Sequence, residues 1–155
     1  MKAFVVTHYG PDGLRAADIP TPPVGSRDVL VDVRAASVNP LDKMVRNGEF
    51  KQLLKYKRPF TLGHDVAGVI TRVGADVHEF QAGDEVYARP RDLRIGTFAE
   101  AIAIDADDVA LKPASLSFPE AARWWLGKLV GRETSSVASW KALWMQQGRR
   151  LIPMH

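Results

Sequence analysis

The adjacent residues His64 and Asp65 are the first whose types and spacing suggest chemistry. Both side chains titrate, and an imidazole changes charge near neutral pH, which suits it to donate or accept a proton or hydrogen bond. The pair stands directly before an apolar, β-branched run, Val66 to Val73. A titratable pair beside buried strands is either a satisfied structural pair, with Asp65 holding the imidazole ring, or part of a site. The two residues alone leave both interpretations open.

Glycines divide the segment around this pair into short strands. They stand at positions 63, 68, 74 and 83, and glycine is typical where the backbone needs a positive φ or a close approach. The β-branched residues between such turns favour strands, and many short strands favour a barrel or a sandwich. The predicted strands are Lys2–Thr7, Leu14–Asp18, a strand that begins near Asp28, Val66–Val73, Glu85–Ala88, Thr97–Ile104 and Val109–Lys112.

A short helix is predicted between Leu41 and Gly48, because the apolar residues have helical spacing and Asn47-Gly48 is a plausible stop. Asp42 and Arg46 lie one turn apart on it. Such an i, i+4 pair predicts an ion pair on a solvated face, and the alternative is that both residues line a substrate entrance.

A second short helix is predicted to begin at Ser117. Ser117 and Glu120 have the spacing of a capping box, which opens a helix through Ala121 and Ala122. The predicted fold class is therefore mainly β with short helices.

Composition limits the kinds of protein that this chain can be. It has 155 residues, 46% of them hydrophobic and 25% charged, which is typical of a soluble globular protein. There is no cysteine, so disulfides and thiolate metal ligands are excluded. No apolar run has the length of a signal-peptide core or a membrane span, and the cytoplasm is the default location.

Charge is distributed unevenly along the chain. Residues 1–122 contain 15 Lys and Arg against 17 Asp and Glu, a balance of −2, whereas residues 123–155 contain 6 against 1, a balance of +5. All four tryptophans also lie in this last segment. The change predicts a boundary between a domain at 1–122 and a Trp-rich, basic tail at 123–155. Because the domain offers no basic stripe, nucleic-acid binding is not expected.

A series of ordered motifs gives the chain a family resemblance: Val38-Asn39-Pro40-Leu41-Asp42 with Arg46 and Gly48, Gly63 to Ala88, Gly96 to Glu100, and Leu116 to Ala122. In this order they resemble the zinc-independent, quinone-oxidoreductase-like branch of the medium-chain dehydrogenase/reductase superfamily. The resemblance implies that residues 1–122 form the family's N-terminal catalytic domain, a GroES-like, partly open β-barrel.

The resemblance also implies particular roles for residues in the site. Asn39 falls where zinc-dependent relatives place a cysteine ligand and His64 falls on their second ligand position, so no metal is expected, because one histidine does not hold a catalytic zinc. The family reaction transfers hydride from NADPH to a quinone or an activated alkene. Asn39 is then a catalytic or cofactor-binding residue that donates to the substrate oxygen or contacts the nicotinamide, or else it only caps a turn. His64 is a catalytic candidate, and Asp42 and Asp65 are substrate-cleft candidates.

The chain departs from the family after Ala122. No G-x-G-x-x-G pattern follows, so the dinucleotide-binding (Rossmann) domain is expected to be absent. Val137, Trp140, Leu143 and Trp144 have helical spacing and predict an amphipathic helix over residues 135–147. Such a tail either covers bare barrel surface, docks on a membrane or a partner and so permits homo-oligomers, or continues a truncated or frame-shifted gene.

The sequence therefore predicts the substrate-binding domain of an NADPH-dependent, zinc-independent quinone or enone oxidoreductase. Without a cofactor domain the isolated chain is expected to be inactive. The alternative is a non-enzymatic, GroES-like binding or oligomerisation module.

Overall fold

The computed structural model of the chain describes residues 1–123 and, beyond them, the short strand β9. One α-helix, α1 (Pro40–Asn47), one 3-10 turn, η1 (Ala106–Asp108), and helical residues 118–123 accompany the strands in these described parts. In chain order the described strands are β1 (Lys2–Val6), β2 (Leu14–Asp18), β3 (Asp28–Val38), β4 (Phe60–Thr61), β5 (Asp65–Val73), β6 (Glu85–Ala88), β7 (Ala101–Asp105), β8 (Val109–Leu111) and β9 (Ser136–Ser139).

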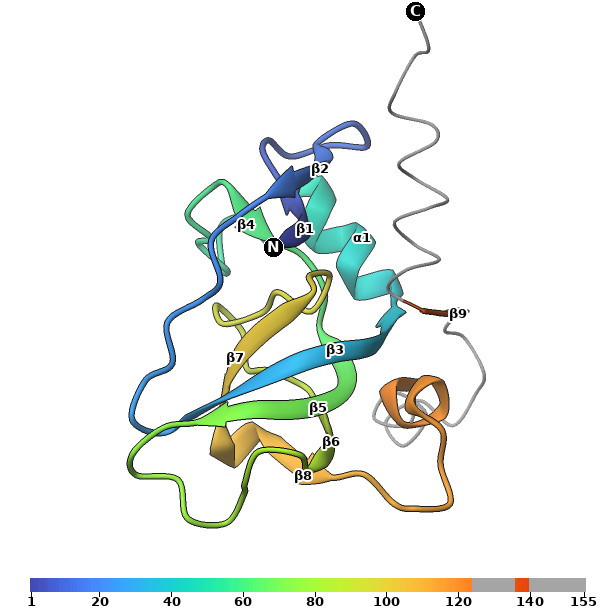
Figure 1. The fold of residues 1–155 in the computed structure, drawn as a ribbon. Helices are drawn as coiled ribbons and strands as arrows, with labels where there is room; N and C mark the ends of the chain where they lie inside the picture. The colour runs from blue at the N-terminus through green and yellow to red at the C-terminus, as the bar shows by residue number, and fades with distance from the viewer. Residues whose placement is uncertain (124–135, 140–155) are drawn as a thin grey trace, which may run out of the picture.

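The strands form two antiparallel sheets that do not close into one ring. The smaller sheet has the order β2-β1-β4, and the larger has the order β7-β3-β5-β6-β8, with β9 also paired to β3 (Figure 1). Strand β3 is 11 residues long and has β5 on one edge. Its other edge is shared by β7 at residues 28–32 and by β9 at residues 35–38. The predicted fold class, mainly β and partly open, is confirmed.

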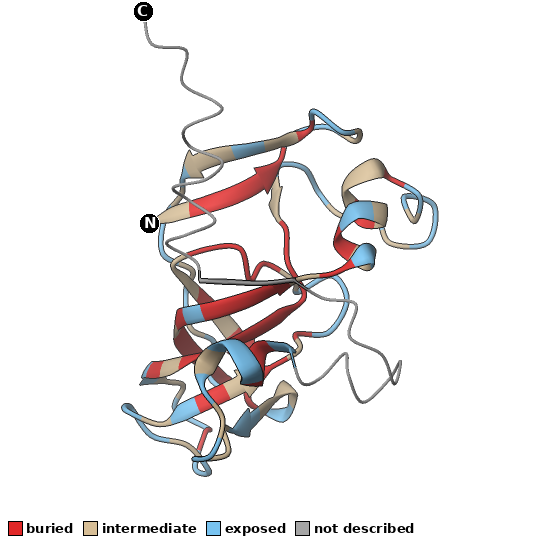
Figure 2. Cartoon of the chain, turned by 90° about the vertical axis from the view of Figure 1, so that its right-hand side faces the viewer, coloured by how far each residue is buried: buried red, intermediate tan, exposed pale blue. Residues whose placement is uncertain are grey.

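Branched aliphatic side chains fill the space between the sheets. Figure 2 shows the buried residues concentrated along the central strands. Each fully buried valine or isoleucine stabilises the fold by roughly 1.5–3 kcal/mol relative to an exposed one. The largest apolar side chains with almost no exposed surface are Val6, Val29, Val31, Val66, Ile70, Val86 and Ile104.

The segment 97–100 joins the two sheets. Phe4 N–H donates to the Phe98 carbonyl (2.8 Å), and Glu100 N–H donates to the Lys2 carbonyl (3.0 Å). These residues therefore bond to β1, and β7 begins only at Ala101. The predicted strand Thr97–Ile104 starts too early for this reason, because its β-forming residues divide between two sheets. Strand β4 is only two residues long and was not predicted.

Two glycines of the Gly63 to Ala88 segment show why glycine is needed there. A Cβ on Gly68 would lie 2.2 Å from the carbonyl oxygen of Asp32 on the neighbouring strand β3. Gly83 has φ +99° and lies in the turn before β6, with open space where a Cβ would point. Close approach and positive φ are thus both used, as predicted.

Helix α1 begins and ends where the sequence predicts. Asn39 is the N-cap with an extended backbone (φ −113°, ψ 158°), Pro40 occupies the first turn, and Gly48 ends the helix in the left-handed region at φ 82°. The second predicted helix also begins with its capping box, since Ser117 N–H donates to Glu120 Oε2 at 2.8 Å. No helix within the described residues is long and apolar enough to cross a bilayer.

The helix predicted over residues 135–147 is wrong at Ser136–Ser139, which form strand β9. The edge of β3 at residues 35–38 extends past β7, and its backbone groups pair with β9 in antiparallel register. Tertiary pairing outweighs the local helical spacing at these four residues. The rest of that helix and the four tryptophans lie outside the described residues, and the boundary near Ala122 stays a prediction.

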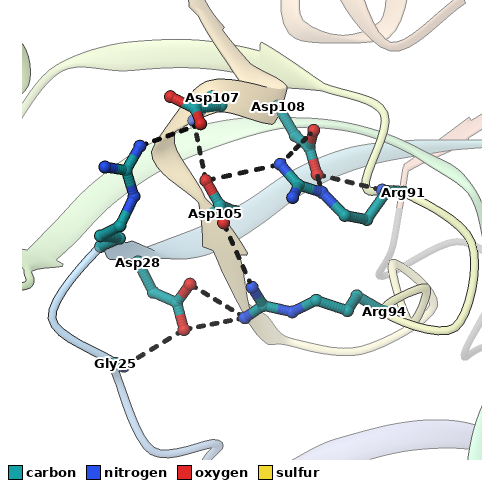
Figure 3. A network of polar contacts seen from close by, with 8 residues as sticks. Gly25, Asp28, Arg91, Arg94, Asp105, Asp107 and Asp108 are labelled. Atoms are coloured by element: carbon teal, nitrogen blue, oxygen red, sulfur yellow. Dashed lines mark hydrogen bonds and ion pairs between the residues drawn. The ribbon is translucent and has the colours of Figure 1, made fainter.

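Ion pairs fasten the 89–96 loop to the large sheet (Figure 3). The Arg94 guanidinium donates to both carboxylate oxygens of Asp28, at 2.9 and 2.8 Å. Arg91 binds both oxygens of Asp108, at 2.8 and 3.0 Å. The pair of Arg91 is bidentate through two nitrogens, which holds a side chain more firmly than a single surface ion pair does. The loop is therefore anchored to β3 and to η1.

Candidate functional site

The four candidate residues of the sequence meet where β3 ends, α1 begins and β5 begins. Asn39 lies between β3 and α1, Asp42 is in the first turn of α1, and His64 and Asp65 lie at the start of β5. All four side chains are buried, with at most 4% of their surface exposed. Buried polar groups on this scale need partners, so their hydrogen bonds decide what the cluster can do.

Asp42 joins the two catalytic candidates. Its Oδ2 accepts a hydrogen bond from the Asn39 N–H at 2.7 Å, and its Oδ1 lies 2.6 Å from His64 Nδ1. A carboxylate only accepts, so Nδ1–H of the ring donates to it. His64 is consequently held with Nε2 as its free nitrogen.

The predicted ion pair between Asp42 and Arg46 is wrong. The Arg46 guanidinium instead donates to Asn47 Oδ1, at 3.2 and 3.0 Å. Helical spacing alone could not show that the face of α1 bearing Asp42 packs inward, against the start of β5. The structural interpretation of His64 also changes, because Asp42 and not Asp65 holds the imidazole ring.

Asp65 is bound to the other side of the cluster. Its Oδ2 accepts hydrogen bonds from Asn39 Nδ2 and from Ser37 Oγ, the latter at 3.3 Å. Burial raises the pKa of Asp65 to about 6, even though the positive charge of Arg89 and the hydrogen bond from Asn39 lower it. The Asp42 charge adds to the increase. Asp65 therefore exchanges its proton in a pH range that is physiologically accessible.

Four buried polar atoms have no hydrogen-bond partner within the described residues: Asn39 Oδ1, His64 Nε2, Asp65 Oδ1 and Thr97 Oγ1. A buried polar atom without a partner costs about 1–3 kcal/mol. Three of the four belong to residues that are hydrogen-bonded to each other or adjacent in sequence, and Thr97 N–H donates to Gly63, the residue before His64. Several buried atoms without hydrogen-bond partners in one part of a fold are typical of a ligand site.

Sequence reasoning missed three residues of the cluster: Ser37, Arg89 and Thr97. Ser37 lies two residues before Asn39, and alternation along β3 was the available signal, since residues i and i+2 share a face of a strand. Thr97 belongs to a family motif, Gly96 to Glu100, but its packing against Gly63 depends on how the two sheets meet. Arg89 acts on Asp65 through its charge, and nothing in the local sequence indicates that.

Metal binding receives no support from the described part of the chain. No three His, Asp or Glu side chains there are grouped so that they could hold a metal ion. Near His64 the other polar groups include an amide, two hydroxyls and two carboxylates, and both carboxylates already accept hydrogen bonds. The donor set suits hydrogen bonding to an organic ligand better than zinc, which prefers thiolate and imidazole.

The chain therefore forms an open, two-sheet β-domain with a buried polar cluster at the junction of β3, α1 and β5. Residues 25–114 match the Alcohol dehydrogenase GroES-like domain. The chain belongs to this family, and its relatives are quinone oxidoreductases of the medium-chain dehydrogenase/reductase superfamily. The resemblance and the GroES-like fold predicted from the motifs are both confirmed.

Individual relatives support the same family. The chain is 36% identical over 137 residues to the mitochondrial NAD(P)H oxidoreductase RTN4IP1 of Mus musculus, covering 79% of this chain and 35% of that protein. It is 38% identical over 130 residues to the chloroplastic NADPH-dependent alkenal/one oxidoreductase of Arabidopsis thaliana, covering 79% of this chain and 33% of that protein.

A solved structure agrees with these sequences. The quinone oxidoreductase from Coxiella burnetii has a TM-score of 0.74 at 34% identity, covering 79% of this chain and 40% of that structure. The chain thus spans only about a third of the length of the curated relatives that it matches.

Proposed function

We propose that this chain supplies the substrate-binding domain of an NADPH-dependent, zinc-independent quinone or enone oxidoreductase. The observation that carries the proposal is the buried cluster around Asn39 and His64, whose unmet hydrogen-bonding atoms lie together in one part of the fold. Buried polar atoms in folded proteins are nearly always hydrogen-bonded, so the four that lack a partner among the described residues mark a place where a ligand or water can bind. The names of the relatives supply the reaction class and the cofactor.

His64 is the residue proposed to act on the substrate oxygen. Its Nδ1–H is held by Asp42, so Nε2 is the nitrogen available to a ligand. When Nε2 also carries a proton, the ring donates from it to an oxygen on which negative charge develops. Asp42 is therefore proposed to be a positioning residue and not a surface that the substrate touches.

Asn39 is proposed to meet the ligand through its carbonyl oxygen. One N–H of its amide is committed to Asp65, and the atom without a partner is Oδ1, an acceptor. An acceptor suits an N–H of the ligand, such as the carboxamide of a nicotinamide, better than it suits a substrate oxygen. Of the two roles predicted from the resemblance, the nicotinamide contact fits this geometry better.

NADPH, when bound, supplies the hydride, and the residues of this chain do the remaining work. The unpartnered Asn39 Oδ1 and His64 Nε2 fit a site for a nicotinamide and a carbonyl substrate, because the first accepts and the second can donate. Burial keeps water away from both atoms, which strengthens each hydrogen bond to the ligand.

A titration of the chain with menadione tests substrate binding without turnover. The chain is labelled with ¹⁵N in its imidazole rings, and menadione is added while the ring nitrogens are observed by NMR. We expect the Nε2 resonance of His64 to shift and that of the exposed His78 to stay in place, so that one molecule contains both probe and control. If His64 does not respond, or if His78 responds equally, the substrate-site assignment is wrong.

Turnover is tested separately. The isolated chain mixed with NADPH and menadione is expected to leave the NADPH absorbance unchanged, since the proposed domain contributes only the substrate side of the site. Sustained NADPH oxidation by the chain alone would contradict the proposal that a cofactor domain is needed. The alternative, a non-enzymatic binding or oligomerisation module, predicts that the imidazole resonances of His64 do not shift with menadione or with NADPH.

A further inference from the structure

We propose that the surface formed by Lys51, Leu53, Lys55, Lys57 and Leu93, here called the basic loop face, binds the surface of an anionic lipid bilayer. These residues belong to two loops, 48–58 after α1 and 89–96 after β6, far from each other in sequence. The loops meet where the Leu93 N–H donates to the Tyr56 hydroxyl at 3.3 Å. The inference is independent of the proposed reaction.

Large apolar side chains are exposed on both loops. Leu53 has 79% of its surface exposed and Leu93 has 59%, two of the three exposed large hydrophobic residues in the described part of the chain. Nothing in the described residues covers them. Because the two loops are in contact through Leu93 and Tyr56, both leucines are available to one partner.

The conformation of Leu93 is an additional sign of function. It is the one non-glycine residue with positive φ in the described residues, at 68°. A branched, bulky side chain rarely adopts this conformation, and such strain persists only where the surroundings enforce it. Arg91 and Arg94, two residues before and one residue after Leu93, hold this loop in place through ion pairs with Asp108 and Asp28 (Figure 3).

The face is positively charged within a domain that is slightly acidic. The 48–58 loop contains Lys51, Lys55, Lys57 and Arg58 against Glu49, a local balance of +3, and Asp92 beside Leu93 reduces it to +2. All three lysines are exposed, and none has an ion pair in the described residues. Charge complementarity therefore points to an anionic partner.

The residue types favour a bilayer over a protein partner. Lysine is depleted at protein interfaces, where aromatic residues and arginine dominate. At a membrane, by contrast, flexible lysines lie among anionic headgroups while leucines insert just below them. The basic loop face has this combination of residue types, with two exposed leucines and three exposed lysines.

Co-sedimentation of the full chain with lipid vesicles tests the proposal. We expect the chain to sediment with vesicles of phosphatidylcholine and phosphatidylserine, to sediment much less with phosphatidylcholine alone, and to be released by salt. Replacing Lys51, Lys55 and Lys57 by glutamine should weaken partitioning by about fivefold for each charge. Leu53→Ser combined with Leu93→Asn should also weaken it, and asparagine tolerates the positive φ, so the loop keeps its fold.

Matched variants make the outcome specific. Leu111→Ser removes a leucine that is also 59% exposed but lies on β8, and Lys43→Gln removes an exposed lysine on α1; both should bind as the unmodified chain does. Failure to bind anionic vesicles overturns the proposal. So does binding that the triple lysine variant retains, since the basic residues 123–155 would then carry it. Binding to polyglutamate but not to vesicles would indicate an acidic protein partner and would also refute it.

Discussion

Asp42→Asn tests the inference that one buried carboxylate holds both catalytic candidates. Asp42 accepts two short hydrogen bonds, from His64 Nδ1–H at 2.6 Å and from Asn39 N–H at 2.7 Å, and its side chain is 2% exposed. A hydrogen bond to a charged group contributes roughly 1.5–3 kcal/mol. Asparagine has one acceptor oxygen, so it accepts from only one of the two donors, and it regains the second bond only if the His64 ring changes its tautomer. We therefore expect the free energy of unfolding to fall by about 1.5–3 kcal/mol, and by about 3–5 kcal/mol for Asp42→Ala, which loses both.

The measurement combines urea unfolding with NMR of the imidazole nitrogens. In Asp42→Asn the side-chain N–H₂ group can face His64, which favours the tautomer that carries its proton on Nε2. A shift of the proton from Nδ1 to Nε2 is therefore expected, and a merely structural role for Asp42 would not produce it. Asp76→Asn is the control, since Asp76 is exposed, and it should change stability by no more than about 0.5 kcal/mol. The reasoning is refuted if Asp42→Asn resembles Asp76→Asn and the His64 tautomer stays as it was.

Three further predictions follow from the structure. Because burial raises the pKa of Asp65 to about 6, the folded chain holds this proton more tightly than the unfolded chain does. The contribution of the protonated Asp65 to the free energy of unfolding is full below about pH 4 and is lost as pH rises through about 6, a decrease of about 3 kcal/mol. Asp65→Asn should remove this decrease from the pH dependence of urea unfolding. Gly68→Ala should lower the free energy of unfolding by about 2–3 kcal/mol, because the new Cβ would lie 2.2 Å from the Asp32 carbonyl oxygen. Gly83→Ala, whose Cβ would point into open space, should lower it by about 1 kcal/mol. Equal losses in the two variants would contradict the packing argument. Arg94→Met should lower the free energy of unfolding by about 1 kcal/mol, because the Arg94 side chain is 41% exposed and its ion pair is partly screened by solvent. The same variant should speed hydrogen exchange in the 89–96 loop. Arg72→Met, at an exposed residue, should leave that exchange unchanged.

Several strands were predictable from sequence because their signals are local. Leu14–Asp18 and Glu85–Ala88 lie between turn-forming residues, and the structure has these strands with the same bounds. The stop of α1 at Gly48 is equally local, since only glycine enters the left-handed region there without cost. By contrast, β7 and β9 depend on which edge of β1 or β3 is free, and the neighbouring residues do not encode that.

The residues of the site were predictable from the sequence, but the hydrogen bonds between them were not. His64, Asp65, Asn39 and Asp42 are brought together as the motifs suggested, yet the partner of His64 proved to be Asp42, 22 residues away. That contact depends on which face of α1 turns toward β5. The pattern of the sequence placed Asp42 on a helix and could not say that its face was buried.

Strand β3 has a consequence for how the chain reaches its fold. It leaves the ribosome before the strands that complete it, β5, β7 and β9, which begin at residues 65, 101 and 136. Contacts of such wide sequence separation slow folding, because the entropy of closing long loops is lost before the strands gain any pairing energy. The apolar residues of β3 therefore remain exposed during synthesis until the later strands are made. We expect aggregation during that interval to limit the yield of this chain more than the stability of the finished sheet does.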